Sequence, residues 1–159
     1  MMKLGDIIHP DAIDPALKTS TRDDSIAAML DMLLAAGCGK GDDRKAYLKA
    51  IIDREQRGST GFGHGVAVPH VKHASIEKPV SAIANVEGGI DFNALDGQPV
   101  HSIVLLLSPE DQPEAHLEAM EAIFGNLSQE TFRRFLRQAT TVEEVATLLT
   151  DADSSHLTS

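Results

Sequence analysis

Residues 54–70 read Arg-Glu-Gln-Arg-Gly-Ser-Thr-Gly-Phe-Gly-His-Gly-Val-Ala-Val-Pro-His. The stretch opens at the end of a helical pattern and then has glycine at four of the eight positions 58–65, which favours turns and close approach of the backbone. Residues 66–68 are all apolar, as in a short strand buried on both faces, and Pro69 ends that strand because it has no N–H for the ladder. A helix, a glycine-rich loop and a buried strand in direct succession predict an α/β domain.

Helical periodicity extends along the chain on either side of this stretch. Before it, one helix begins at a capping box at residues 21–24 and a second helix runs from about residue 42 to 57. After Pro109, apolar residues return at helical spacing in three successive stripes, and the last stripe follows a second cap at residues 141–144. These patterns predict helices at both ends of the chain.

Two more buried strands are predicted, at residues 80–86 and 102–107, with a connection between them that is rich in turn residues. Strands in the middle of the chain and helices at both ends indicate one layered α/β domain. We expect this domain to occupy residues 1–153 and to be followed by a polar tail at residues 154–159.

Composition excludes several classes of protein. The chain has 159 residues, with 42% hydrophobic and 24% charged residues, which suffices to bury a core without disulfides or metal. Its single cysteine, Cys38, forms no intrachain disulfide, so a reducing compartment is favoured. The longest apolar run, residues 103–107, is too short to cross a bilayer. We therefore expect a cytoplasmic protein that is not inserted into a membrane.

The formal net charge of −10 disfavours binding to the phosphates of nucleic acids and to acidic membranes. One dense basic cluster, Arg133, Arg134 and Arg137, stands out against this background. Because the three arginines lie on a predicted helix, we expect them to form a solvated helix face.

His70 is the residue where chemistry is expected. It follows the buried strand, beside the glycine-rich loop and near Arg54 at the end of the preceding helix. A neutral imidazole nitrogen is nucleophilic near pH 7, so a histidine can accept a phosphoryl group. Phosphoryl transfer needs donors fixed around the phosphoryl oxygens, and loop N–H groups and a guanidinium can supply them. The residue types alone leave a purely structural histidine open.

The stretch resembles the active-site signature of the enzyme IIA domains of the phosphoenolpyruvate-dependent phosphotransferase system, fructose/mannitol class (type 2). The residues in register with that signature are Arg54-Glu55, Gly58 to Gly61, Gly65, Val66-Ala67-Val68 and Pro69-His70. A second block also resembles the family: Phe92 to Val100, the apolar strand after it, Pro109 and His116-Leu117. The resemblance covers Leu4 to the last helix and implies the enzyme IIA type-2 fold, a three-layer α/β/α arrangement with a small mixed sheet flanked by helices.

The resemblance implies roles for three residues: His70 is the phosphoryl acceptor, Arg54 faces the phosphate, and His116 is a second active-site histidine. It implies a phosphotransferase component that needs no cofactor or metal and takes phosphate from a histidine phosphocarrier such as HPr. A IIB domain or a regulatory protein is expected downstream. The sequence of residues 58–61 is closer to the nitrogen-regulatory branch than to the mannitol branch, which favours a regulatory switch over direct sugar transport.

Two positions depart from the family pattern and leave alternatives open. Val71 stands where the family usually has glycine, and a β-branched residue is expected to resist positive φ and to crowd a docking phosphocarrier. His64 stands where the family often has Asn or Asp. Val71 favours a protein-binding module of the same fold that is not phosphorylated. His64, His70 and His73 together suit zinc chemically, which keeps a metal site as a third possibility.

Overall fold

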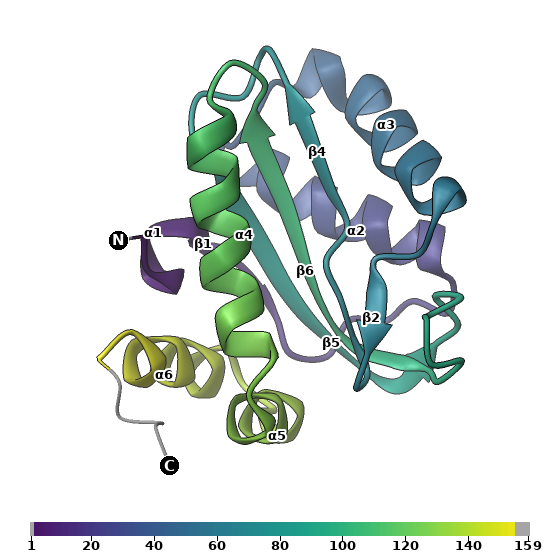
Figure 1. Cartoon of the computed structure of the whole chain (residues 1–159), viewed down its shortest axis with the longest axis vertical. Helices are drawn as coiled ribbons and strands as arrows, with labels where there is room; N and C mark the ends of the chain where they lie inside the picture. Colours follow the sequence, from purple (N-terminus) through teal and green to yellow (C-terminus); the bar gives the residue numbers. More distant parts are fainter. Residues whose placement is uncertain (1, 155–159) are drawn as a thin grey trace.

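β6 is the strand around which the sheet is built. The computed structural model describes residues 2–154. The strands are β1 (Ile8–Asp14), β2 (Gly61–Gly63), β3 (Val66–Ala67), β4 (His70–His73), β5 (Val80–Ile90) and β6 (Val100–Pro109). β6 pairs antiparallel with β5 and parallel with β3 and β4. β1 lies parallel to β5, and β2 lies antiparallel to β3. The result is one mixed sheet of six strands, in agreement with the prediction (Figure 1).

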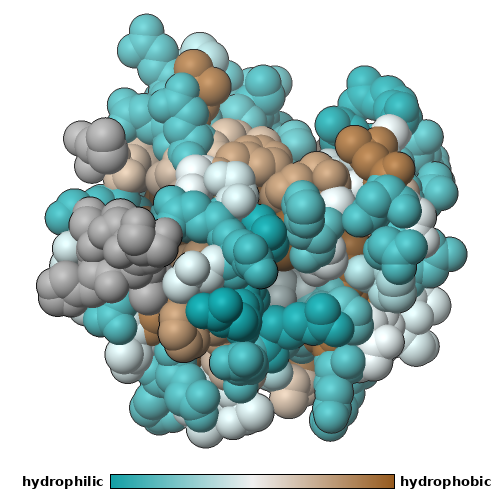
Figure 2. Space-filling view, turned by 60° about the horizontal axis from the view of Figure 1, so that its bottom comes forward, coloured by the Kyte–Doolittle hydropathy of each residue, from teal (hydrophilic) through white to brown (hydrophobic). Residues whose placement is uncertain are grey.

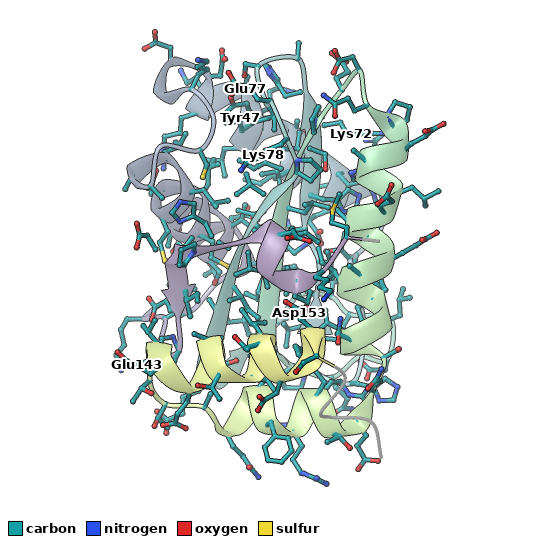
Figure 3. All side chains as sticks on the ribbon, turned by 90° about the vertical axis from the view of Figure 1, so that its left-hand side faces the viewer. Tyr47, Lys72, Glu77, Lys78, Glu143 and Asp153 are labelled. Atoms are coloured by element: carbon teal, nitrogen blue, oxygen red, sulfur yellow. The ribbon has the colours of Figure 1, made fainter. Side chains whose placement is uncertain are left out.

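Helices cover both faces of this sheet. They are α1 (Leu4–Ile7), α2 (Arg22–Ala35), α3 (Arg44–Arg57), α4 (Pro113–Leu127), α5 (Glu130–Gln138) and α6 (Val142–Asp153), with a short 3-10 turn η1 (Gly41–Asp43) before α3. α2 and α3 lie on one face, and α4 lies on the other with α1, α5 and α6 (Figures 1 and 3). The predicted three-layer α/β/α arrangement is confirmed.

The period of two along β6 divides the apolar interior into two cores. Ile103, Leu105 and Leu107 pack into the core under α2 and α3. Val104 and Leu106 point to the opposite face, into the core under α4, α5 and α6. All five side chains are buried, which explains why residues 102–107 are almost continuously apolar.

The caps predicted for two helices are present. Thr21 Oγ1 accepts a hydrogen bond from the Asp24 N–H at 3.1 Å, and Thr141 Oγ1 accepts one from the Glu144 N–H at 3.1 Å. After α2, the backbone of Gly37 adopts a φ of +85°, which glycine tolerates without steric cost. Such signals can be predicted because they depend on residues only a few positions apart.

The structure contains three strands that the sequence pattern does not predict: β1, β2 and β4. β1 lies at the edge of the sheet and contains Pro10 and exposed polar residues, so it shows little apolar signal. β4 begins directly after Pro69, whose carbonyl accepts a hydrogen bond from the Leu106 N–H at 3.0 Å and keeps the chain beside β6. β5 also runs past its predicted end at residue 86, through an irregular register, to Ile90.

The carboxylate of Asp153 joins the two ends of the described chain. It accepts hydrogen bonds from the Leu4 N–H at 2.9 Å and the Gly5 N–H at 2.8 Å. The last turn of α6 is therefore held against the first turn of α1. Apart from Ser154, the predicted tail lies outside the described residues. Between residues 2 and 154, no helix has the length and apolar character needed to cross a membrane.

Candidate functional site

His70 is the first residue of β4, where Pro69 has just interrupted the strand. Its ring is half-buried, and Nδ1 lies 2.8 Å from the carbonyl oxygen of Val68. A carbonyl oxygen only accepts hydrogen bonds, so Nδ1 carries the proton and donates it. The remaining lone pair of the neutral ring therefore lies on Nε2.

His116 approaches His70 from the first turns of α4. The two rings are 5.7 Å apart between centroids and are tilted by 47°. Nδ1 of His116 shares a hydrogen bond of 2.7 Å with the hydroxyl of Ser108, which is fully buried near the end of β6. β6 therefore holds the ring of His116 in place through Ser108, a residue that the sequence pattern alone does not single out.

Arg54 lies in the last turn of α3 and turns back over the glycine-rich loop. Its Nη1 donates to the carbonyl oxygen of Gly58 at 2.6 Å. The loop beneath it is held from inside by the buried carboxylate of Glu55, which accepts from the Thr60 N–H at 3.1 Å and from the Thr60 hydroxyl. Ser59 adds a hydrogen bond of 2.7 Å from its hydroxyl to the carbonyl oxygen of Phe92. These bonds fix the loop whose Gly58 carbonyl orients the Arg54 guanidinium.

One cavity of about 830 Å³ brings the three predicted site residues together, between the end of α3, β4 and the start of α4. It is lined by Ala50, Arg54, Arg57, Gly58, Ser59, His70, Val71, Lys72, Leu95, Glu110 and His116. Figure 3 shows Lys72 beside the N-terminal half of α4. Arg54, Arg57 and Lys72 face a single acidic lining residue, Glu110, so the cavity is positive in a chain whose net charge is −10. The cavity therefore suits an anion.

The family of this chain follows from a match to one known protein family over nearly its whole length. The model of the family "Phosphoenolpyruvate-dependent sugar phosphotransferase system, EIIA 2" matches residues 6–152. This chain belongs to that EIIA family.

Relatives of this EIIA domain carry two kinds of name. It is 32% identical over 152 residues to the "PTS system fructose-specific EIIABC component" of Bacillus subtilis (strain 168), covering 96% of this chain and 24% of that protein. It is 32% identical over 148 residues to a "Nitrogen regulatory protein" of Bradyrhizobium diazoefficiens, covering 93% and 95%. The chain thus spans about a quarter of the first relative and nearly all of the second.

Among solved structures, the EIIA domain resembles the Nitrogen Regulatory Protein IIA-Ntr of Neisseria meningitidis. The TM-score is 0.81 at 29% identity, over 92% of this chain and 98% of that one. The fold predicted from the resemblance is therefore confirmed by a relative of similar length.

Burial sets the protonation state of both histidines in the EIIA cavity. Burial is the largest cause that lowers the pKa of His70 below its usual value. The hydrogen bond to the Val68 carbonyl opposes it, while Arg54 and Lys72 lower the pKa further and Glu55 raises it. Burial also lowers the pKa of His116, with His70 and Lys72 acting in the same direction. Both rings are therefore neutral at pH 7, the state in which imidazole is a nucleophile.

The prediction that Val71 strains the backbone after His70 is wrong. Among residues 2–154, the only residues other than glycine with positive φ are His64 and Asn93. Val71 is instead an ordinary extended residue of β4, paired with Leu107, and only 6% of its surface is exposed because its side chain packs into the core. Val71 therefore gives no support to a binding module that has lost phosphoryl transfer.

The three histidines of the possible zinc site do not form one. His73 packs edge-on against Tyr47 at 4.9 Å, and its Nδ1 accepts from the Ser75 N–H at 3.0 Å. His64 lies in the turn between β2 and β3, exposed to solvent. Over the described part of the chain, no group of three or more His, Cys, Asp or Glu residues is arranged to hold a metal ion.

Proposed function

We propose that this EIIA domain carries a phosphoryl group on Nε2 of His70. The observation that supports this most directly is the hydrogen bond from His70 Nδ1 to the carbonyl oxygen of Val68. It keeps the proton on Nδ1 and leaves Nε2 with the lone pair. In the transfer, the bond between the donor nitrogen and phosphorus breaks as the Nε2–P bond forms, and the proton stays on Nδ1, which keeps donating to the Val68 carbonyl oxygen.

Arg54 and His116 are suited to hold the phosphoryl oxygens. One nitrogen of the Arg54 guanidinium is bound to Gly58, which orients the group and leaves its other N–H donors for an anion. His116 is oriented through Nδ1 by Ser108, so its Nε2 is the nitrogen available to the phosphoryl group. Donors fixed in advance stabilise the charge that spreads over the oxygens during phosphoryl transfer.

The proposed donor is a phosphohistidine of an HPr-like phosphocarrier. Two leucines near the cavity are well exposed, Leu95 with 75% and Leu117 with 58% of their surface. Leu95 lines the cavity, and Leu117 follows His116 in α4. Exposed apolar side chains around a positive cavity suit a protein partner that delivers a charged group at the centre of its contact.

Incubation with phosphoenolpyruvate, enzyme I and an HPr-like phosphocarrier tests the acceptor. We expect acid-labile phosphate on the wild type and none on His70→Ala. His9→Ala is the matched control, because His9 lies outside the cavity, and it should be labelled normally. Arg54→Ala should slow labelling on the order of 100-fold, as when one preorganised donor to a transition state is lost. Label that persists on His70→Ala would refute the proposed acceptor.

We further propose that phosphorylation serves regulation rather than bulk sugar uptake. Residues 58–61 resemble the nitrogen-regulatory branch, and the solved IIA-Ntr of Neisseria meningitidis matches the domain with a TM-score of 0.81 at 29% identity. A phosphoryl group adds nearly two negative charges beside Arg54 and Lys72, which changes the surface that a partner meets.

A reconstitution experiment separates regulation from transport. The phosphorylated domain is mixed with IIB and IIC components of the fructose class, and sugar phosphate is measured over time. We expect no sugar phosphorylation above a reaction without the domain, while a regulatory partner binds one phosphorylation state in preference. Steady phosphate flow onto sugar at the rate of a fructose-specific EIIA would overturn the regulatory proposal and leave His70 as acceptor untouched.

A further inference from the structure

A second basic cavity lies away from His70, toward the other end of β6. β3 pairs with β6 where Val66 lies opposite Ser102, near the start of β6. β4 pairs with β6 where His70 lies opposite Leu106, four residues further along β6. The second cavity has a volume of about 450 Å³. It is lined by His64, Gly65, Val66, Ser102, Glu130, Arg133, Arg134, Arg137 and Gln138, and it shares no lining residue with the cavity of His70.

Three arginines of α5 face this cavity without a carboxylate partner. Every ion pair within 4.0 Å in the described residues lies elsewhere, on α2 and α3. Arg133 donates one N–H to the Leu127 carbonyl at 2.9 Å, and Arg137 lies 3.1 Å from Nε2 of His101. Arg134 stacks over a neighbouring phenylalanine ring at 5.5 Å. Each guanidinium has five N–H donors, so every one keeps several for a ligand.

The charge of the cavity is unusual for this protein. Three arginines and one acidic residue, Glu130, line it, in a chain with ten more acidic than basic residues. Guanidinium groups held close together repel one another, and an anion between them removes that repulsion. Figure 2 brings this end of the molecule forward and shows hydrophilic side chains gathered there. The arginine face of α5, which the sequence predicts to be a solvated helix face, therefore forms one wall of this cavity.

His64 supplies an independent sign of a site at the rim of this cavity. Its φ is +60°, a left-handed conformation that Asn, Asp and Gly adopt more easily than His. The turn is held by a hydrogen bond of 3.2 Å from the His64 N–H to the carboxylate of Asp96. Residues other than glycine that are held in such conformations cluster at ligand sites and persist where the surrounding structure fixes them, here through the bond to Asp96.

We propose that the cavity between α5 and the β2–β3 turn binds a small organic phosphate, such as a nucleotide. The planar fork of arginine matches two phosphate oxygens at once, and Arg134 with Arg137 places two such forks on one helix face. The volume lies within the range of small-molecule sites, about 300–1,000 Å³. His64 lines the cavity opposite α5, and its ring carries an N–H that can donate to a phosphate oxygen.

Titration of the full chain with ADP and with pyrophosphate tests this site. The measurements are made in an Arg54→Gln background, because the cavity of His70 also attracts anions. We expect saturable binding by calorimetry, with amide NMR shifts confined to residues 64–66, 102 and 130–138. The double variant Arg134→Gln/Arg137→Gln should weaken binding by about tenfold or more, because it removes two charged donors from the phosphate oxygens.

A matched pair of substitutions separates a specific site from general attraction. Arg22→Gln/Arg44→Gln removes the same charge from partly exposed positions on α2 and α3, outside the cavity, and should change the Kd less than about twofold. Equal weakening by both double variants would overturn the proposal. The absence of saturable binding up to about 10 mM ligand, a range that covers even millimolar affinity, would also overturn it. Binding of a glutamate-rich peptide without binding of ADP or pyrophosphate would overturn it as well. Thermal melts of each variant establish that it is folded.

Discussion

At the scale of single residues, two short contacts set the state of the site histidines. The Val68 carbonyl accepts from Nδ1 of His70, and the Ser108 hydroxyl holds Nδ1 of His116. Burial is the largest cause of the lowered pKa of each ring. A neutral acceptor receives a phosphoryl group without first losing a proton, so both contacts and burial favour the same chemistry.

His70 is expected to be the Nδ1–H tautomer and to titrate below the ordinary histidine value of about 6.5. The physical reason is burial beside positive charges, as the lowered pKa indicates. Nitrogen-15 NMR of the imidazole rings across the pH range measures both properties, with His70→Gln assigning the signals. A ring that carries its proton on Nε2 at neutral pH would contradict the proposed nucleophile.

The same pKa shift makes stability depend on pH. Because the folded-state pKa of His70 lies below the unfolded value, the folded state binds fewer protons. The stability that this group contributes is therefore fully present above about pH 6.5 and is lost as pH falls through that value toward the folded pKa. His70→Gln should reduce the loss of unfolding free energy between neutral and mildly acidic pH, as measured by urea denaturation.

At the scale of elements, the turn after α3 sets the position of Arg54 in the site. The Leu95 N–H donates to the Gly61 carbonyl oxygen at 2.8 Å, which joins β2 to the loop after β5. A Cβ added at Gly61 would lie 2.9 Å from Cβ and 3.2 Å from Cα of Ala94. The φ of Gly61 is not positive, so backbone conformation does not require glycine at this position. Glycine is needed because the backbone of residue 94 approaches too closely for a Cβ.

Gly61→Ala is expected to destabilise the fold by about 1–3 kcal/mol, the usual cost of overpacking, and to slow phosphorylation because the turn that seats Arg54 must shift. Gly88→Ala, within β5, is the control because nothing lies within 4 Å of the added Cβ. Chemical denaturation and the initial labelling rate measure the two effects. Equal behaviour of the two variants would show that the close approach to Ala94 has no consequence.

At the scale of the whole molecule, the two ends of the chain form one contact. Asp153 at the end of α6 caps the N–H groups that begin α1, with 2.9 and 2.8 Å bonds to Leu4 and Gly5. A four-residue helix cannot be stable by itself, because the cost of its first turn is not recovered. α1 therefore depends on this cap and on burial of Leu4 and Ile7 in the core under α4 and α6.

Asp153→Ala should lower the free energy of unfolding by about 1 kcal/mol, the usual value of a lost helix cap. Asp151→Ala is the matched control: it removes a carboxylate from the same helix turn whose side chain makes no hydrogen bond within the described residues. Urea denaturation of the two variants compares them. A loss in Asp151→Ala as large as in Asp153→Ala would attribute the effect to charge alone.

Much of the fold can be predicted from short stretches of sequence. Thr21 and Thr141 cap α2 and α6 as their spacing to Asp24 and Glu144 predicts, because a cap needs only residues within one turn. The apolar run of β6 predicts a strand buried on both faces. β1 and β4 could not be predicted in this way, because they pair with strands distant in the chain and β1 lies exposed at an edge.

The sequence by itself determined the helices with caps, the buried strands, the family resemblance and three candidate residues, Arg54, His70 and His116. Only the tertiary structure decided which nitrogen of His70 is free, that Ser108 orients His116, and that Val71 is buried without strain. It also decided that the arginines of α5 form the wall of a cavity with a turn some seventy residues earlier in the chain. The physical reason is range. Caps and periodicity act over a few residues, whereas burial and cavity walls arise when the sheet brings distant segments together.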